Sequence, residues 1–434
     1  RAGPPVPESL MIDADLLLLH ASPLVTNGAG RGPKTGSDLR ELGEIADGAL
    51  AAFGGIVTWA GSSGDAASAV RLRPGSTTID ASGMLVAPGF VDPHTHCLFA
   101  GSRENEFAMR LAGKTYQEIA ASGGGIRSSV RATRAASEAE LYELTRRHLD
   151  RALLDGVTTA EIKISYGLSL EHDLKGLGVL GRLSADHPVR IVPTYMGAHE
   201  FPDDYRDRRE DYVQNVITGL PEIARQGIAK FCDVFCEDGV FTPDQTRRIL
   251  SAARDAGLGL KVHADEFGPS GGSDVAIELG ATSADHLHAM PAANLAPMKT
   301  AGVIPVLLPA TAFFLRLNHH APARAMIDAG LPIALATDGN PGSSMTESMP
   351  LVMTIACLQF GLEPEEAFSA ATVNAAAAIG LADSVGRLAP GYAADFQILE
   401  APNVKYLAYH FGRSHVRSVY AAGRKVVDDG WIVR

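Results

Sequence analysis

The chain repeats one local pattern along most of its length, in which a short β-rich run is followed by a segment with helical periodicity. Eight such runs follow one another: LVAPGFVDPH, GVTTAEIKI, VRIVPTYMGAH, KFCDVFCE, GLKVHA, ATSADH, GVIPVLLP and PIALATD. Parallel strands need long crossover connections, and helices usually supply them. Eight strand and helix units over about 300 residues predict an α/β fold, a (β/α)8 TIM barrel.

Two of the connecting segments carry the start and stop signals of a helix. In SEAELYELTRRHLDRALLDG, Ser137 and Glu140 have the spacing of a capping box, and Gly156 marks the stop. In TPDQTRRILSAARDAGLG, Thr242 is a candidate cap and Gly257 a stop. These signals favour helices, rather than further strands, between the runs.

The flanks of the barrel region have a different pattern. Residues 11–84 and 387–434 contain short strand-like segments with Gly-rich turns. We expect them to form one small β-sandwich domain built from both chain termini, beside a barrel of residues 85–386. The residues before Met11 are interpreted as a tail outside these domains.

Composition excludes several classes of function. The net charge of −12 argues against nucleic acid or an anionic membrane as a partner, because phosphate binding needs a basic surface. The four cysteines are too sparse for a disulfide framework, which favours a cytoplasmic setting. No secretory signal is evident, and the longest apolar run, AGVIPVLLPATAFFL, contains two prolines and is shorter than a membrane span. We therefore expect a soluble enzyme that acts on a small molecule.

Polar residues stand where the β-rich runs stop, which is where a TIM barrel carries its active site. These residues are His94, His96, His199, His263, His286 and Asp338. Successive side chains of an extended strand point to opposite faces, so the imidazoles of His94 and His96 share a face and can converge on one point.

Three imidazoles and one carboxylate form a donor set suited to zinc or iron with a position left for water. We assign His94, His96, His263 and Asp338 as ligands of one divalent ion. Such an ion lowers the pKa of its bound water to about 7, and proton transfer then needs an acid or base. Glu266, three residues after His263, is one candidate. His286 is the other and is placed to polarise a carbonyl or stabilise an oxyanion.

Several longer motifs together resemble one family. They are PGFVDPHTHCLFAGSRENEF, ASGGGIRSSVRATRAASE, YMGAHEFP, FCDVFCEDGVFT, VHADEF, SADHL and ATDGNPGSSMTESM. The set is similar to the motifs of the imidazolonepropionase family in the amidohydrolase superfamily, which acts in histidine degradation. The resemblance implies a barrel with a β-rich second domain and one divalent metal ion, zinc or iron. It also implies hydrolysis of 4-imidazolone-5-propanoate to N-formimidoyl-L-glutamate.

The resemblance also implies roles for individual residues. The metal ligands of the family match the four assigned above, and its catalytic residues match Glu266, His286 and Asp338. Its substrate contacts match Arg103, Tyr166, His199, Glu266, Asn340, Gly342 and Ser343. The guanidinium of Arg103 can bind the propionate with two hydrogen bonds, although an ion pair with Glu104 or Glu106 is the alternative. Tyr116 either adds a phenol donor or packs in the core or on the surface.

Three features leave alternatives open. Ile164-Ser165 stands where the family usually has Ser-Gly, so the backbone or pocket near Tyr166 is expected to differ. Lys163 is either structural or a carboxylated lysine that bridges two metal ions. The GGGIRSSVR segment is either a flexible connection or a lid that closes on an anionic substrate through Arg127 or Arg131.

Three rival functions share part of this pattern, and one of them is hydrolysis of another small anionic cyclic amide. A metal-dependent deaminase of a heterocyclic base would also use H-x-H, H-A-x-E and a late Asp. Its substrate, a neutral base, has no carboxylate for Arg103 to bind. A catalytically inactive barrel that binds a metabolite or a protein would have no need of Glu266 and His286. A homodimer is expected only because two-fold oligomers are common among soluble enzymes.

Overall fold

The computed structural model describes residues 11–28, 30–114, 118 and 124–433. The chain divides into two compact units. One comprises Arg1–Asp92, Ala152–Thr159 and Ser348–Arg434, and the other comprises Pro93–Arg151 and Ala160–Glu347. The domain boundaries given above, between residues 84 and 85 and between 386 and 387, stay predictions.

All eight β-rich runs contain a strand of one eight-stranded sheet. Its order is β15-β14-β13-β12-β11-β10-β9-β8, and the registered pairs from β10 to β15 are parallel. The strands are β8 (Phe90–Asp92), β9 (Val157–Ile164), β10 (Arg190–Ala198), β11 (Phe231–Cys236), β12 (Gly259–Ala264), β13 (Ser283–His286), β14 (Ile304–Leu307) and β15 (Ala334–Leu335). The predicted fold class, a (β/α)8 barrel, is confirmed.

The barrel closes where the segments after its first and last strands meet. Thr95 forms a parallel bridge with Gly339. The N–H of Asp338 donates to the carbonyl of His94 (3.0 Å), and the N–H of His96 donates to the carbonyl of Gly339 (3.1 Å). This closing seam places His94 and His96 beside Asp338, although about 240 residues separate them in the chain.

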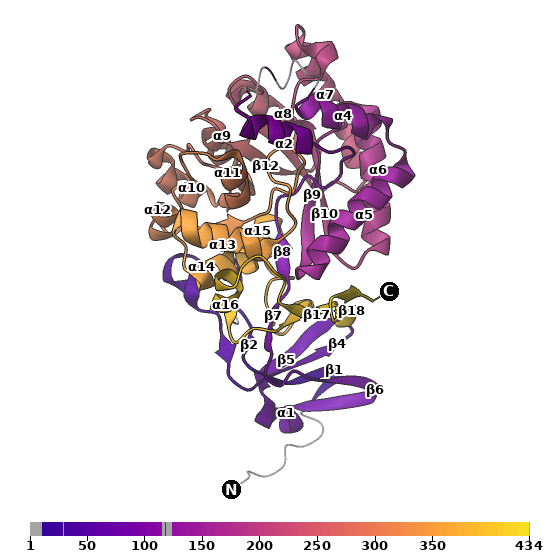
Figure 1. The fold of residues 1–434 in the computed structure, drawn as a ribbon, viewed down its shortest axis with the longest axis vertical. Coiled ribbons are helices and arrows are strands. Elements are labelled where there is room, and N and C mark those ends of the chain that lie inside the picture. Colours follow the sequence, from indigo (N-terminus) through magenta and orange to yellow (C-terminus); the bar gives the residue numbers. More distant parts are fainter. Residues whose placement is uncertain (1–10, 29, 115–117, 119–123, 434) are drawn as a thin grey trace. The chain divides into compact units, whose positions relative to one another are not determined.

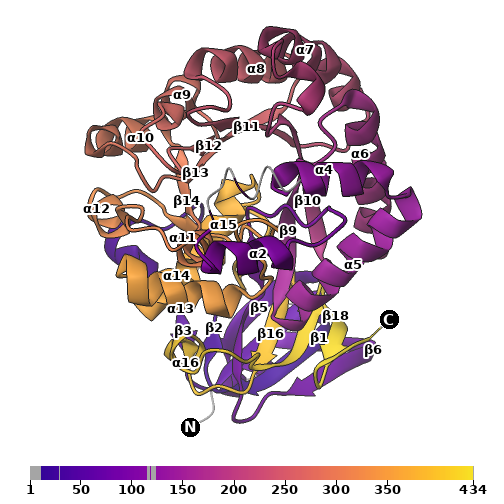
Figure 2. The same cartoon turned by 45° about the horizontal axis from the view of Figure 1, so that its top comes forward.

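Helices lie outside the strands of the barrel, as α5 to α10 do in Figure 2. The helices of this region are α2 (Glu104–Leu111), α4 (Ile126–Ala135), α5 (Glu138–Leu154), α6 (Leu170–Asp186), α7 (Arg209–Arg225), α8 (Pro243–Asp255), α9 (Gly272–Leu279), α10 (Leu295–Ala301), α11 (Pro309–Leu315) and α12 (Ala323–Asp328). Both predicted caps are present. Glu140 N–H donates to Ser137 Oγ (3.2 Å), and Thr242 forms a full capping box with Gln245 at the start of α8.

Strands from both ends of the chain form two further sheets (Figure 1). A four-stranded sheet, β5-β4-β1-β6, contains β1 (Ile12–Ala21), β4 (Gly48–Phe53), β5 (Ile56–Ser62) and β6 (Val70–Asp80). A seven-stranded sheet, β19-β18-β17-β16-β7-β2-β3, contains β2 (Leu24–Val25), β3 (Glu44–Ile45), β7 (Leu85–Pro88), β16 (Phe396–Leu399), β17 (Val416–Ala421), β18 (Arg424–Asp428) and β19 (Trp431–Ile432). The expected β-rich part built from both termini is confirmed.

One apolar cluster fills the space between residues of these two sheets. It includes Leu18 of β1, Val86 of β7 and Phe396 of β16, all fully buried. The remaining helices of this unit are α1 (Ser63–Ala69), α13 (Met349–Phe360), α14 (Pro364–Ala370), α15 (Val373–Ala378) and α16 (Val404–Tyr409). No helix among the described residues is long and apolar enough to cross a membrane.

The first β-rich run divides between two sheets. Its first half, β7, pairs antiparallel with β16, and its second half, β8, joins the barrel. Gly89 lies at the division, where a Cβ atom would be 2.3 Å from Oγ1 of Thr158. Any side chain at position 89 would clash with Thr158, so this position requires glycine.

Candidate active site

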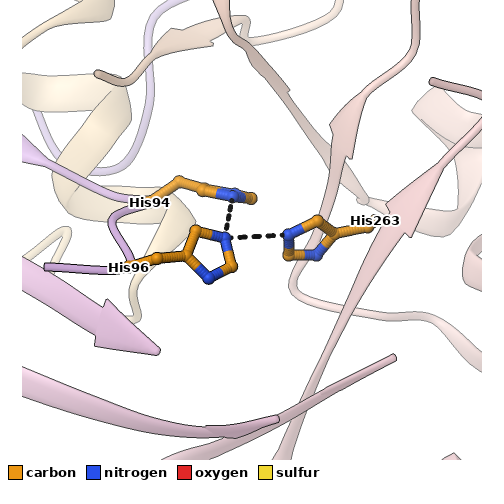
Figure 3. A group of neighbouring side chains, drawn as sticks. All are labelled: His94, His96 and His263. Atoms are coloured by element: carbon orange, nitrogen blue, oxygen red, sulfur yellow. Dashed lines mark hydrogen bonds between the residues drawn. The ribbon is translucent and has the colours of Figure 1, made fainter. Parts of the chain in front are cut away.

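Three histidine side chains converge inside the barrel. Nε2 of His96 lies 3.2 Å from Nε2 of His94 and 3.2 Å from Nε2 of His263 (Figure 3). Oδ1 of Asp338 lies 3.5 Å from Nε2 of both His94 and His96. All four side chains are buried. The structure therefore brings together the four residues that were predicted to bind a metal ion.

The other ring nitrogen of each histidine faces an oxygen atom. The Nδ1 contacts are His94 to Asp285 Oδ2 (2.6 Å), His96 to Ser165 Oγ (2.8 Å) and His263 to Asp233 Oδ2 (3.0 Å). A carboxylate accepts a hydrogen bond, so it favours the tautomer with the proton on Nδ1 and leaves the lone pair on Nε2. For His94 and His263 the Nε2 lone pair is thereby directed into the histidine group, and the hydroxyl of Ser165, which can also accept a hydrogen bond, is compatible with the same tautomer of His96.

This arrangement fits a divalent ion. Nε2 of His96 lies 3.2 Å from Nε2 of both His94 and His263, and nitrogen lone pairs at this separation repel one another unless they share a cation. Two nitrogens bound at about 2.0–2.1 Å to a tetrahedral zinc ion lie about 3.3 Å apart, close to the observed separation. Three nitrogens and one carboxylate also suit iron.

Below the histidines lies a buried network of charges around Lys163. Its Nζ contacts carboxylate oxygens of Asp233 (2.7 Å), Glu161 (2.9 Å) and Asp285 (3.4 Å), and all four side chains are fully buried. Burial opposes the charge of Lys163, but the three carboxylates together raise its pKa above the ordinary value. A carboxylated lysine would add a fourth negative group here, so the structure favours an ammonium that holds the carboxylates behind the histidines.

Glu266 and His286 lie together at one side of the histidine group. Nε2 of His286 is 3.6 Å from Oε2 of Glu266, and both side chains are buried. Burial raises the pKa of Glu266 well above its ordinary value, and the charges of Asp338 and Glu237 raise it further. Burial and the neighbouring His263 and His288 hold the pKa of His286 well below its ordinary value. These two residues can therefore supply a protonated carboxyl and a neutral imidazole.

Local backbone structure sets the position of these groups. Glu237, at the end of β11, accepts hydrogen bonds from the N–H groups of Glu266 (2.9 Å) and Phe267 (3.0 Å). His286 (φ 74°) and Asp338 (φ 53°) both have left-handed backbone conformations. Such a conformation costs of order 1–3 kcal/mol in a residue other than glycine and is frequent at active sites.

These residues line a cavity of about 360 Å3 that also contains the predicted substrate contacts. Its lining includes Arg103, Tyr166, His199, Glu266, His286, Asp338, Asn340, Gly342 and Ser343. The size suits a small ligand. Every predicted site residue with a described position thus lies at this cavity or within the histidine group, and their individual roles stay predictions. Tyr116 lies outside the described residues.

Asn340, Gly342 and Ser343 form one tight turn after the last barrel strand. Oδ1 of Asn340 accepts hydrogen bonds from the N–H groups of Gly342 and Ser343, both at 2.8 Å, and its Nδ2 donates to the carbonyl of Asp338 (2.7 Å). The Asn340 amide therefore holds the turn. A Cβ at position 342 would lie 2.3 Å from Nη1 of Arg103, so glycine permits the guanidinium to approach.

Ile164 has an ordinary strand conformation, and the expectation that the backbone or pocket near Tyr166 differs from that of the family stays a prediction. Ile164 is the last residue of β9, is buried, and has no left-handed conformation. Its Cγ2 would lie 3.0 Å from a Cβ at Gly176 of α6, so it packs toward that helix. The next residue, Ser165, contacts His96, and Tyr166 lines the cavity.

The rings of Tyr166 and His199, which lie beside His96, are both uncharged at neutral pH. Burial raises the pKa of Tyr166 above its ordinary value and lowers the pKa of His199 to about 3, with His263 as a second cause. Nδ1 of His199 lies 3.0 Å from the carbonyl of Ser165, which favours a proton on Nδ1 and leaves Nε2 as an acceptor.

The GGGIRSSVR segment is largely helical. The helix α4 begins at Ile126, and Arg127 pairs with Asp203 at 3.2 Å. Gly125 and Ile126, rather than Arg127 or Arg131, are among the residues that line the cavity. The interpretation of GGGIRSSVR as a flexible connection is therefore wrong for its residues 126–131, because they belong to the regular helix α4. Closure of this segment over a substrate stays a prediction.

Sequence reasoning missed the carboxylates behind the histidines. Asp233 lies inside the run FCDVFC and Asp285 inside SADH, and both are fully buried in strands. A charged residue within an otherwise apolar buried strand needs a partner, because an isolated buried charge is very unfavourable. That pattern was the available signal. Arg110 of α2, which also lines the cavity, was missed as well, and Glu106 was considered only as an ion-pair partner of Arg103.

The fold and the site define a class of enzymes. The profile of the Amidohydrolase family matches residues 85–426, so the chain belongs to that family. Solved structures have the same fold at low sequence identity. An adenosine deaminase from Xanthomonas campestris with bound zinc is 17% identical with a TM-score of 0.73, covering 99% of this chain and 95% of that chain. An N-isopropylammelide isopropylaminohydrolase from Burkholderia multivorans is 18% identical with a TM-score of 0.68, covering 96% and 99%.

Closer relatives narrow the class. An imidazolonepropionase from Geobacillus kaustophilus is 49% identical over 419 residues, which cover 96% of this chain and 98% of that protein. An imidazolonepropionase from Symbiobacterium thermophilum is 48% identical over 427 residues, which cover 98% and 100%. Within the amidohydrolases, the chain belongs to the imidazolonepropionase family.

Proposed function

We propose that this chain hydrolyses the cyclic amide bond of 4-imidazolone-5-propanoate to N-formimidoyl-L-glutamate, a step of histidine degradation. One observation carries the proposal: a single cavity is lined by two of the converging histidines, by the Glu266 and His286 pair and by Arg103. The cavity therefore combines a hydrolytic centre with a cationic group suited to a carboxylate. The names of the close relatives support the same reaction.

His94, His96, His263 and Asp338 would hold one divalent ion, which we propose to be zinc or iron. A bound ion of this kind lowers the pKa of a coordinated water to about 7, which makes a nucleophile available at neutral pH. Nδ1 contacts to Asp285, Ser165 and Asp233 keep the three imidazoles in the orientation that ligation needs.

Glu266 and His286 serve the proton transfers and the charge that develops on the substrate. Opening of the ring requires a proton on the departing nitrogen, and the attacking water must lose one. The carboxylate of Glu266 can accept the proton that the attacking water loses and then donate a proton to the departing nitrogen, and burial favours the protonated form that makes this donation by raising the pKa of Glu266. The neutral imidazole of His286 can donate one N–H to the oxygen of the attacked carbonyl.

Arg103 would bind the propionate group of the substrate. Its Nε already pairs with Glu106 at 2.8 Å, while Nη1 lies against Gly342. Arg103 therefore forms the ion pair with a neighbouring glutamate that the sequence offered as an alternative, and its side chain also lines the cavity.

We also propose a cytoplasmic location and a homodimer. The homodimer is proposed only because two-fold symmetric oligomers are common among soluble enzymes.

The test is turnover of freshly prepared 4-imidazolone-5-propanoate, followed by loss of absorbance and by mass spectrometry of the product. We expect formimidoylglutamate from protein loaded with zinc or iron and little product after chelation. Glu266→Gln should retain metal and lose about 100-fold or more in kcat, as removal of an acid-base group usually does. Glu138→Gln, an exposed change of the same chemistry on α5, is the matched control.

Two results would contradict the proposal. Metal-loaded protein that releases ammonia from a heterocyclic amine and leaves imidazolonepropanoate intact would identify a deaminase. A Glu266→Gln variant with near-normal kcat would remove Glu266 from the reaction.

A further inference from the structure

The helix α2 presents three charged residues to the cavity at helical spacing. Arg103 is the N-cap of α2, and Glu106 and Arg110 follow three and seven residues later, which places all three on one face. All three line the cavity, and each is partly buried. Only Arg103 is among the substrate contacts implied by the family resemblance.

The two guanidinium groups meet at the same residue. Nη1 of Arg103 would lie 2.3 Å from a Cβ at Gly342, and Nη2 of Arg110 donates to the carbonyl oxygen of Gly342 at 3.1 Å. Arg110 also lies over the ring of Phe314, with 5.0 Å between Cζ and the ring centroid. Stacking on an aromatic face fixes the plane of a guanidinium. Arg110 is therefore held next to Arg103 rather than extended into solvent.

The carboxylate beside the two arginines is that of Glu106, and it pairs with Arg103. Oε2 of Glu106 accepts from Nε of Arg103 at 2.8 Å. Oε1 of Glu106 accepts from the N–H of Gly125 at 2.9 Å and lies 3.3 Å from Oγ of Ser128. Among the described residues, no carboxylate forms an ion pair with Arg110. Within the group formed by Arg103, Glu106 and Arg110, two guanidinium groups accompany one carboxylate, which is an excess of one positive charge.

We propose that Arg110, together with Arg103, forms a two-arginine subsite that selects a substrate bearing one carboxylate. The single negative charge of the propionate matches the single excess positive charge, and the guanidinium groups offer planar donors suited to a carboxylate. This inference rests on the proposed function for the identity of the substrate. Burial and the neighbouring Arg103 lower the pKa of Arg110, which agrees with two cations held close together.

The experiment compares binding of two non-reacting analogues to the metal-loaded protein by isothermal titration. The analogues are imidazole-4-propanoate and imidazole-4-propanamide, which differ in charge but hardly in size. In Arg110→Met, which keeps an apolar stem against Phe314, we expect the Kd of the carboxylate to rise about 30-fold. A charged hydrogen bond contributes about 1.5–3 kcal/mol, and 1.4 kcal/mol corresponds to a tenfold change. The Kd of the amide should change less than about threefold.

Two further variants separate charge from packing. Arg110→Lys keeps the cation, and we expect it to bind the carboxylate within about fivefold of the wild type. Arg225→Met makes the same charge change on α7, where Arg225 pairs with Glu222 and is 70% exposed, and should alter neither Kd. If Arg110→Met fails to fold, the comparison of Arg110→Lys with Arg110→Gln gives the same test.

The inference is overturned if Arg110→Met weakens both analogues equally, if it weakens neither, or if the wild type does not prefer the carboxylate. These readouts need no turnover. A protein that prefers the carboxylate through Arg110 but does not hydrolyse imidazolonepropanoate would refute the proposed function and leave the subsite intact.

Discussion

Burial shifts the pKa of several single residues in this protein. It lowers the pKa of His199 to about 3 and raises that of Asp338 to about 6, so each departs toward its neutral form. Lys163 is an exception, because three carboxylates surround it. The balance between desolvation and pairing therefore assigns charged and neutral roles to neighbouring side chains.

Asp173, in the first turn of α6, tests how desolvation and charge pairing together set the pKa of a buried carboxyl outside the histidine group. Burial raises its pKa from 3.8 to about 8. The folded state thus holds a proton that the unfolded state releases above pH 4. The contribution of protonated Asp173 to the free energy of unfolding is fully present below about pH 4. It decreases as the pH rises from about 4 to about 8, by at most about 1.4 kcal/mol per pH unit. Asp173→Asn should remove this loss.

Urea unfolding at pH 5 and pH 8.5 checks the prediction. The stability of Asp173→Asn relative to the wild type should increase between the two pH values. Asp207→Asn, at an exposed position, serves as the control. A constant difference between Asp173→Asn and the wild type would show that Asp173 is already ionised in the folded protein.

At the scale of elements, the boundaries are set by local side-chain chemistry. The helix α8 begins at a capping box of Thr242 and Gln245, with Pro243 at its first position, and is followed by Gly257 with a φ of 86°. Each feature satisfies or removes unpaired backbone groups at the helix ends. Such signals depend on neighbours in the chain, so they could be predicted from the sequence.

Removal of the Thr242 cap gives the corresponding prediction. Thr242→Ala leaves the N–H of Gln245 without its acceptor, and we expect a loss of about 1 kcal/mol in the free energy of unfolding. Thr218→Ala, in the middle of α7 and exposed, should be neutral or slightly stabilising because alanine favours helices. Equal effects of the two changes in urea unfolding would rule out a capping role for Thr242.

At the scale of the whole molecule, the barrel seam assembles the histidine group. The N–H of Asp338 donates to the carbonyl of His94, and the N–H of His96 donates to the carbonyl of Gly339, so the segments after the first and last strands are joined at the site. An ion held there would connect β12 with both sides of the seam, since His263 lies in β12. Metal binding is therefore expected to stabilise the closed barrel as well as to serve chemistry.

Metal removal tests this coupling. A free ion at 1,000 times its Kd should stabilise the folded protein by about 4 kcal/mol, so the Tm should fall on chelation and recover with added zinc. His94→Asn removes a ligand and should lose most of this response. A Tm that does not depend on metal, in protein whose metal content does change, would refute the coupling.

Much of this architecture followed from patterns within short stretches of sequence. The eight strands were recognisable because short β-rich runs alternate with segments of helical periodicity, two of which carry a cap and a glycine stop, and those preferences are local. The polar residues at the strand ends, such as His263 and Asp338, were recognisable for the same reason. Parallel strands share one direction, so their ends share one rim.

Other features depended on contacts between distant residues. The division of the first run at Gly89, the partners Asp233 and Asp285, and the meeting of Arg103 with Arg110 at Gly342 were not evident from sequence spacing. The sequence by itself determined the order of the elements and the chemistry available at their ends. Only the tertiary structure decided which groups meet, because closure of the barrel and the resulting desolvation arise from the folded chain as a whole.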